Sequence, residues 1–178
     1  MIGLIAYGSL MHPDELASHC TREPPVLPVR VRGYRRTFCQ ESTWRGGHSE
    51  SRGVLTVEPS ENSWFNAILV AECDPDLISS LDFRERGYDR IDVPTASVEP
   101  YAPDTDLGGF TAINMYRGRP EKWNADLIPN PDYVALCTAA AERWGPIFLD
   151  DFLATTYSGG VPLELGEPGR PGKGGRDS

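Results

Sequence analysis

The chain has 178 residues, of which 39% are hydrophobic and 24% are charged. This length fits one domain of ordinary size with its own hydrophobic core. With 17 Lys and Arg against 26 Asp and Glu, the net charge is −9. Such a charge repels polyanions, which argues against nucleic acid and anionic membranes as partners. It also requires any site for an anionic small molecule to be built locally from Arg side chains or backbone N–H groups.

The chain shows neither a targeting segment nor a metal motif. No apolar run approaches the roughly 20 residues that cross a bilayer, and residues 1–6 lack a basic flank, so we expect a cytoplasmic protein. The four cysteines have no C-x-x-C spacing, and the three histidines do not stand in a metal-ligand pattern beside them. We therefore expect reduced thiols that are mostly buried, without a disulfide framework, a metal or a cofactor.

Strands dominate the first half of the chain. Residues 2–7 are a predicted buried strand that breaks at Gly8. Pro13, followed by two acidic residues, predicts the first turn of a helix soon after that break. The elements expected next, in order, are strands at 29–32 and 34–40, a polar loop at 41–52, and strands at 53–57 and 64–71. The last two strands flank a turn at residues 58–62, which predicts a hairpin.

Helices become more frequent in the second half. Asp74 and Pro75 supply an N-cap and a first-position proline, so they open a helix that we expect Gly87 to end. The elements expected after it, in order, are strands at 90–98 and 110–116 and helices at 131–143 and 148–153. Residues 165–178 carry Gly, Pro and charge without an apolar period, which predicts a flexible tail behind a domain of residues 1–164. This order favours an α+β fold built on a small mixed sheet or barrel.

A carboxylate falls on the apolar face of the helix predicted after Asp74. Leu77, Leu81 and Glu85 are spaced i, i+4 and i+8, so they lie along one side of the helix. Burial disfavours the charged form of a carboxyl group and raises its pKa, which suits a group that exchanges protons near neutral pH. The spacing also fits a solvated Arg-Glu-Arg patch at a fraying helix end, and taken alone it favours that simpler interpretation.

The Tyr-Gly-Ser-Leu segment at residues 7–10, here called the 7–10 loop, is a second candidate. It follows a buried strand and precedes a helix, where backbone N–H groups can converge on an anion or a carbonyl oxygen. Taken alone, a plain turn between strand and helix is the simpler interpretation. The segment is not the elbow of a serine hydrolase, because the chain has no G-x-S-x-G and no His with evident triad partners.

Five segments, in order across residues 1–90, resemble the γ-glutamyl cyclotransferase superfamily and look most like its ChaC-type, glutathione-directed branch. They are YGSL at 7–10, GYRRTF at 33–38, STWRG at 42–46, GVLTV at 53–57 and LDFRERGY at 81–88. A fainter similarity continues through residues 114–116 and 130–133. The chain departs from the ChaC-type pattern in a shorter 42–46 loop, in one Gly instead of two near residue 87, and in its ending.

The resemblance implies a small mixed β-barrel with flanking helices and a γ-glutamyl cyclotransferase activity that releases 5-oxoproline. By motif position, Glu85 is then the general acid and base, and the 7–10 loop binds the γ-glutamyl part of a small-molecule substrate such as glutathione. The candidate substrate-binding residues are Tyr7, Gly8, Ser9, Leu10, Arg45, Tyr88 and Tyr116. Arg45 and Arg52 could pair with a substrate carboxylate, although a solvent-facing loop charge explains both equally well. The tyrosines also fit ordinary core positions.

Two alternative functions stay open. A cyclotransferase for γ-glutamyl amines, or for a γ-glutamyl-protected biosynthetic intermediate, fits the same motifs. A noncatalytic module that binds a γ-glutamyl compound or 5-oxoproline fits them too, although a buried carboxylate without a function costs stability. The sequence leaves the leaving group and the oligomeric state open.

Overall fold

The computed structural model of the protein describes residues 1–42 and 53–163. The elements, with 3-10 turns written η, are β1 (Ile2–Ala6), η1 (Ser9–Met11), α1 (Pro13–Ala17), β2 (Val26–Glu41), β3 (Gly53–Val70), α2 (Pro75–Arg84), β4 (Tyr88–Asp92), η2 (Thr95–Ser97), β5 (Val98–Pro100), β6 (Ala112–Gly118), η3 (Pro120–Lys122), α3 (Pro131–Glu142), α4 (Pro146–Ala154), β7 (Thr156–Ser158) and β8 (Val161–Pro162). The tail predicted at 165–178 lies outside the described residues.

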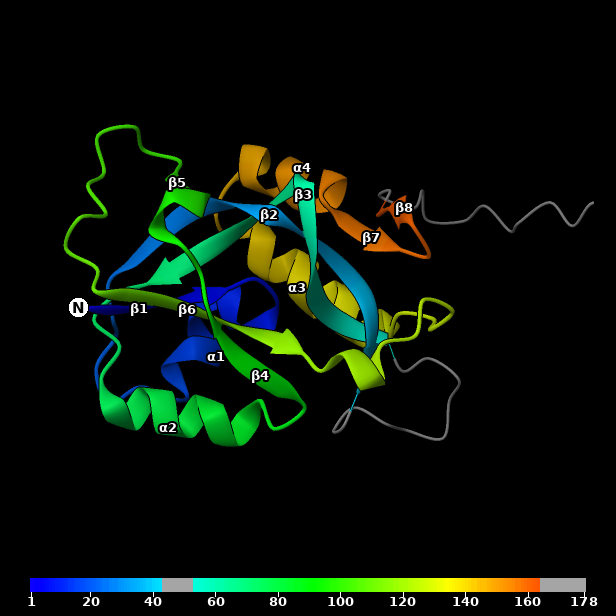
Figure 1. Ribbon diagram of the computed structural model, residues 1–178, viewed down its shortest axis with the longest axis horizontal. Coiled ribbons are helices and arrows are strands. Elements are labelled where there is room, and N and C mark those ends of the chain that lie inside the picture. The colour runs from blue at the N-terminus through cyan, green and yellow to red at the C-terminus, as the bar shows by residue number, and fades with distance from the viewer. Residues whose placement is uncertain (43–52, 164–178) are drawn as a thin grey trace, which may run out of the picture.

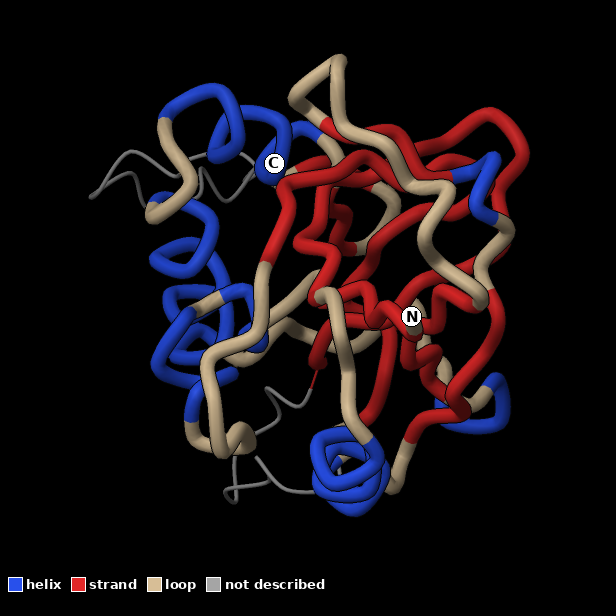
Figure 2. Tube along the Cα trace, turned by 90° about the vertical axis from the view of Figure 1, so that its left-hand side faces the viewer, coloured by secondary structure: helices blue, strands red, loops and turns tan. Residues whose placement is uncertain are grey.

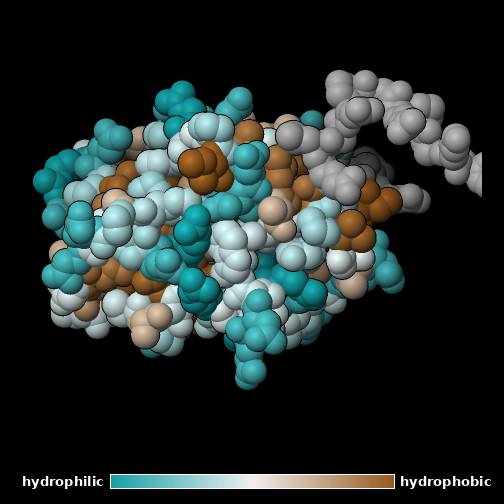
Figure 3. All heavy atoms as spheres, turned by 90° about the horizontal axis from the view of Figure 1, so that it is seen from above, coloured by the Kyte–Doolittle hydropathy of each residue, from teal (hydrophilic) through white to brown (hydrophobic). Residues whose placement is uncertain are grey.

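The outer surface is mostly polar where it is seen from above. Hydrophilic residues cover much of that face, and hydrophobic ones show in separate groups (Figure 3). Among the described helices, none combines the length and the apolar character needed to cross a lipid bilayer.

The described strands form one mixed sheet in the order β4-β6-β1-β3-β2-β7-β8, with β5 also paired to β2. β1 is parallel to β6 and β2 is parallel to β7, whereas the other pairs are antiparallel. The sheet is strongly curved (Figure 1), and the side view in Figure 2 shows the helices in separate groups around the strands. The α+β class predicted from the sequence is confirmed.

The sheet does not close into the barrel that the resemblance implied. Its end strands, β4 and β8, do not pair with each other in the described part of the chain. The edge of β2 that faces away from β3 is shared by β5, over three residue pairs, and β7, over two. β8 has only two residues. Strands this short do not carry the ladder round to β4.

β2 and β3 form one long antiparallel pair, so the hairpin expected around residues 58–62 is wrong. The flanking pairs in the register are Arg32 with Trp64 and Tyr34 with Pro59. Residues 60–63 therefore stand opposite Gly33 alone, as a large bulge inside β3. Gly33 has a φ of 86°, a conformation that glycine adopts readily. Such bulges bend a strand and increase its twist, which accounts for the curvature of this pair.

β1 is a central strand whose two faces are both buried. Leu4 and Ala6 pack in a core that also contains residues of α1 and α2. Ile5 and Tyr7 pack in a larger core with residues of α3 and α4. Because side chains alternate along a strand, the chain leaves β1 at the boundary between the two cores. The 7–10 loop begins at that boundary.

The predicted start signals of α1 and α2 are confirmed, since both helices have a capping side chain followed by proline. Asp74 accepts a hydrogen bond from the Leu77 N–H at 2.7 Å and so satisfies one of the free N–H groups of α2. The end of α2 is earlier than expected, at Arg84 and not near Gly87. The strand expected over residues 90–98 is divided into β4 and β5 by η2.

A guanidinium group lies inside the larger core. Arg36 of β2 is fully buried and donates six hydrogen bonds to described residues, all to neutral oxygens. The acceptors are Tyr7 O (3.2 Å), Asn66 O (2.7 Å), Asn66 Oδ1 (2.8 Å), Phe152 O (3.2 Å), Thr155 Oγ1 (3.3 Å) and Thr156 Oγ1 (2.8 Å). Burial lowers the pKa of Arg36 to about 9, which leaves it charged at neutral pH. Arg36 thus ties the end of β1 to β3, α4 and β7.

Replacing Arg36 by Met should lower the free energy of unfolding by about 3–5 kcal/mol, because several buried acceptors lose their donor at once. Urea denaturation measures this loss. The matched control is Arg32→Met on the same strand, which removes a solvent-exposed pair with Glu99 and should cost about 1 kcal/mol or less. Equal stability of the two variants would contradict the role given to Arg36.

Candidate active site

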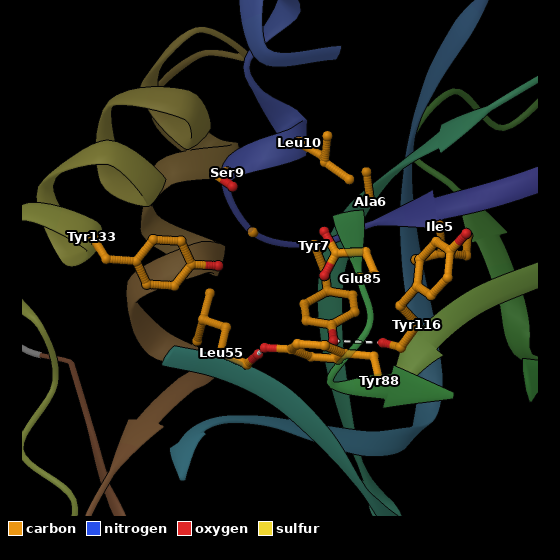
Figure 4. A pocket seen from close by; sticks show the side chains of 11 residues that line it. Ile5, Ala6, Tyr7, Ser9, Leu10, Leu55, Glu85, Tyr88, Tyr116 and Tyr133 are labelled. Atoms are coloured by element: carbon orange, nitrogen blue, oxygen red, sulfur yellow. Dashed lines mark hydrogen bonds between the residues drawn. The ribbon is translucent and has the colours of Figure 1, made fainter. Parts of the chain in front are cut away.

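A pocket opens beside the 7–10 loop, where β1 and α2 both end. It encloses about 360 Å³, including the part open to solvent, a size that suits a small molecule. Its lining residues are Ile5, Ala6, Tyr7, Gly8, Ser9, Leu10, Leu55, Glu85, Tyr88, Tyr116 and Tyr133. In the close view, Tyr133 of α3 faces Tyr7 and Tyr88 across the pocket, with Glu85 in front of Tyr7 (Figure 4).

The structure brings together seven of the eight site residues predicted from the sequence. Glu85, the four residues of the 7–10 loop, Tyr88 and Tyr116 all line this pocket. They come from the end of β1, the end of α2, β4 and β6, which are distant in the sequence. Arg45, and with it Arg52, lies outside the described residues.

Four lining residues were not predicted as site residues: Ile5, Ala6, Leu55 and Tyr133. Ile5 and Ala6 precede the 7–10 loop, and Leu55 lies in the GVLTV segment. In the sequence, their apolar side chains cannot be distinguished from those of ordinary strand residues. For Tyr133, the sequence does contain a local signal, the helix cap that fixes its position in the first turn of α3. This tyrosine follows Asn130, whose side chain accepts a hydrogen bond from the Tyr133 N–H at 3.1 Å, and such a cap fixes the first turn of α3.

Gly8 allows the phenol of Tyr133 to approach the backbone of the 7–10 loop. A Cβ atom at Gly8 would lie 2.8 Å from the Tyr133 hydroxyl oxygen, which is closer than real Cβ contacts come. The backbone of Gly8 has φ −129° and ψ −135°, so its φ is not in the left-handed region. The glycine is therefore needed for space and not for a positive φ.

Glu85 follows the last residue of α2 and places its side chain in the pocket. Its N–H donates to the Leu81 carbonyl at 2.8 Å, and its side chain is 19% exposed. Leu77 and Leu81 are buried on the same side of the helix. The predicted helix face is thus correct, although the helix ends one residue before Glu85. The Arg84 Nε atom lies 3.2 Å from Glu85 Oε1.

The hydroxyls of Tyr7, Tyr88 and Tyr116 donate hydrogen bonds that fix their rings. Tyr7 donates to the Tyr116 carbonyl oxygen at 2.5 Å (Figure 4), and Tyr88 donates to the Leu55 carbonyl oxygen at 2.7 Å. Tyr116 donates to Asp82 Oδ1 at 2.7 Å. The walls of the pocket are therefore held by bonds between separate strands and to α2.

All four tyrosines are held in the neutral form. Burial is the main cause that raises the pKa of Tyr7, Tyr88, Tyr116 and Tyr133. The negative charge of Glu85 contributes to the raised pKa in each case, because it opposes a second negative charge nearby. The site is thus a carboxylate surrounded by neutral phenols.

The arrangement suits proton transfer on a small bound molecule. Within the described lining, Glu85 is the residue with a carboxyl side chain. Neutral phenols can donate or accept hydrogen bonds, and the 7–10 loop contributes backbone groups. In residues 1–42 and 53–163, no group of three or more His, Cys, Asp and Glu side chains could hold a metal ion.

Comparison with solved structures identifies the fold. A γ-glutamyl cyclotransferase superposes with a TM-score of 0.62 at 15% identity, over 96% of this chain and 93% of that chain. A glutathione-specific γ-glutamyl cyclotransferase from yeast superposes with a TM-score of 0.57 at 19% identity, over 86% of this chain and 94% of that chain. An uncharacterized protein from Homo sapiens gives a TM-score of 0.54 at 16% identity, over 93% of both chains.

The chain has the γ-glutamyl cyclotransferase fold. The resemblance stated from the sequence is thereby confirmed at the level of fold. The sequence matches no protein-family model and no curated protein. The activity of this γ-glutamyl cyclotransferase-like chain therefore has to be argued from its own pocket.

Gly8→Ala should lower the free energy of unfolding by about 1–3 kcal/mol, because the new methyl group overlaps the Tyr133 hydroxyl. The matched test is the same change in a Tyr133→Phe background, where the overlapping oxygen is gone. There Gly8→Ala should cost clearly less, as measured by urea denaturation. An identical cost in both backgrounds would show that Tyr133 is not what Gly8 makes room for.

The pocket tyrosines should make the fold sensitive to alkali. The unfolded chain loses phenol protons near pH 10, whereas the folded protein keeps those of Tyr7, Tyr88, Tyr116 and Tyr133 to higher pH. Their contribution to stability is therefore fully present below about pH 10 and is lost as the pH rises further. In a spectrophotometric titration at alkaline pH, their tyrosinate absorbance should develop together with the loss of the folded circular dichroism signal. Four extra phenolates in a still folded protein would contradict this account.

Proposed function

We propose that the protein is a γ-glutamyl cyclotransferase. In this reaction the α-amine of a γ-glutamyl compound attacks its own γ-carbonyl carbon and closes a five-membered ring. The new C–N bond forms as the old amide C–N bond breaks, giving 5-oxoproline and a free amine. The observation that carries the proposal is the Glu85 carboxylate in a small-molecule pocket beside the 7–10 loop, on a fold that solved cyclotransferases share.

Glu85 is proposed as the acid and base of this reaction. It accepts a proton from the attacking ammonium or amine and delivers a proton to the leaving nitrogen, so the proton count balances. Such general acid-base catalysis typically contributes about 10²–10⁴-fold to a rate. Glu85 is positioned for it at the end of α2, with its side chain mostly shielded from solvent.

The 7–10 loop is proposed to bind the γ-glutamyl part. All four of its residues line the pocket, and Gly8 has no side chain to keep a substrate away from the backbone. Backbone N–H groups there could stabilise the oxyanion that forms as the γ-carbonyl is attacked, or bind the α-carboxylate. A pocket that holds the substrate folded for ring closure also removes much of the entropic barrier.

The reaction needs no nucleophile from the enzyme, which agrees with the surroundings of Ser9. The Ser9 Oγ atom accepts a hydrogen bond from Arg84 Nη2 at 3.0 Å, which leaves it poorly suited to attack a carbonyl. His19 lies close to this hydrogen bond, and its two ring nitrogens contact Arg84 and Ser80. A serine hydrolase mechanism therefore has no supporting geometry at this serine.

Glutathione or a similar γ-glutamyl peptide is the proposed substrate class. The yeast structure with this fold is described as specific to glutathione, and it covers 86% of this chain. A coupled assay for 5-oxoproline over a panel of γ-glutamyl peptides, γ-glutamyl amino acids and γ-glutamyl amines identifies the leaving group. Faster release from the amines would move the assignment to that substrate class.

Glu85→Gln should reduce 5-oxoproline release at least 100-fold while ligand binding and the folded state are kept, because Gln keeps the shape and removes the proton acceptor. The matched control is Glu99→Gln on β5, a surface residue paired with Arg32, which should stay within twofold of the unchanged enzyme. The readouts are the coupled assay, calorimetric ligand binding and thermal unfolding. A Glu85→Gln enzyme with full activity would rule out the mechanism, and an unchanged enzyme that binds the panel without turnover would favour the binding module.

A further inference from the structure

Arg84 lies directly behind the pocket without lining it. It is the last residue of α2, and its side chain is 22% exposed. Its Nε atom lies 3.2 Å from Glu85 Oε1, and its Nη2 atom donates to Ser9 Oγ at 3.0 Å. One rigid guanidinium thus connects the carboxylate of Glu85 to the 7–10 loop, 75 residues away in the chain.

The guanidinium of Arg84 also contacts Glu15 of α1 and His19, which follows α1 in the chain. Arg84 Nη2 also contacts Glu15 Oε2 at 3.2 Å, and Nη1 lies 3.0 Å from His19 Nε2. Arginine has donors only, so His19 Nε2 accepts this bond and the proton sits on Nδ1, which contacts Ser80 Oγ at 2.9 Å. Burial and the charge of Arg84 lower the pKa of His19, which agrees with a neutral ring.

We propose that Arg84 is a positioning residue of the active site, which holds Glu85 and the 7–10 loop in one fixed relative geometry. The proposal rests on the function proposed above. Arg84 acts through its two neighbours in the pocket and does not itself touch the substrate.

The geometry separates this role from that of an ordinary surface ion pair. Both partners, Arg84 and Glu85, are mostly shielded, and all three guanidinium nitrogens have a partner in the described structure. A planar fork with fixed donors restrains several groups at once, which a single ammonium group cannot do. Glu15 and His19 keep the fork from rotating away from the pocket. Displacement of a catalytic group by about 1 Å can cost 100-fold in rate, so such a restraint matters for catalysis.

Three variants separate geometry from charge. Arg84→Gln removes both the fork and the charge, and Arg84→Lys keeps the charge without the fork. Arg86→Gln removes the charge of the residue that follows Glu85 in the chain. Arg86 is exposed, and its guanidinium carbon lies 4.6 Å from the centre of the Phe83 ring. The activity readouts are kcat and KM for 5-oxoproline release and the pH profile of kcat/KM.

For Arg84→Gln we expect kcat to fall at least tenfold with KM changed less than threefold. The acidic limb of the pH profile should move up by about one pH unit, because a cation next to the proton acceptor is lost. The charged and titratable groups facing this acceptor and Arg84 are Glu15, His19, Tyr7, Tyr88, Tyr116 and Tyr133. Arg84→Lys should restore the pH limb but not kcat, and Arg86→Gln should stay within twofold in kcat. Equal losses in Arg84→Gln and Arg86→Gln, or full kcat in Arg84→Lys, would overturn the proposal.

A readout without turnover keeps this test separate from the proposed function. In backbone NMR spectra, Arg84→Gln should shift the amide signals of residues 8–10, and Arg86→Gln should leave them in place. Unmoved loop signals in Arg84→Gln would overturn the positioning role even if the enzyme is active. If the unchanged protein releases no 5-oxoproline, the proposed function fails, whereas shifted loop signals would still support the restraint on the loop.

Discussion

The buried guanidinium of Arg36 is the constraint on which the rest of the structure depends. A charge without contact to water has to satisfy all its donors, and here six bonds reach the end of β1, β3, α4 and β7. One of these bonds goes to the Tyr7 carbonyl, at the first residue of the 7–10 loop. The position of the loop is thus set from inside the core as well as by the pocket residues.

Two arginines therefore restrain the 7–10 loop from opposite directions. Arg36 holds Tyr7 from the core, and Arg84 contacts Ser9 from the end of α2. Between them, Gly8 lies against the Tyr133 hydroxyl of α3. A loop of four residues with three such restraints can present its backbone in a fixed arrangement. Preorganised groups of this kind stabilise a developing charge without reorganisation during the reaction.

The pocket matches a reaction in which the substrate supplies both reacting groups. A single carboxylate among neutral phenols can carry a proton from one nitrogen to another, and ring closure needs little more than a fixed substrate shape. The net charge of −9 does not favour anions at long range. A substrate α-ammonium, in contrast, matches the carboxylate of Glu85.

The sequence predicted those parts of the fold that local signals determine. The proline that opens α1, the cap before α2, the buried strand before residue 7 and the helix face that carries Glu85 all depend on neighbouring residues, and all are present. The predicted hairpin failed because the turn-forming residues 58–62 fall at a bulge that is set by the register with β2. Arg36 and Tyr133 were not predicted as key residues. The role of Arg36 depends on partners such as Thr156, which is 120 residues away in the chain, and the role of Tyr133 depends on its contact with Gly8.

The prediction of a closed barrel was wrong for a similar reason, since closure depends on pairing between strands at the two edges of the sheet. Strand signals in the sequence do not give the lengths of β5, β7 and β8, which are too short to extend the sheet to β4. The candidate site was more predictable than the sheet closure, because ordered motifs identified seven of its residues. The apolar lining residues carried no comparable signal.

The central claim is that the γ-carbonyl is attacked by the substrate's own amine and not by water. Turnover of a γ-glutamyl peptide in water enriched in oxygen-18, followed by mass spectrometry of the products, tests it most directly. The account predicts 5-oxoproline without the heavy isotope as the product that accompanies the free amine. Glutamate carrying oxygen-18 in its γ-carboxylate would contradict the account.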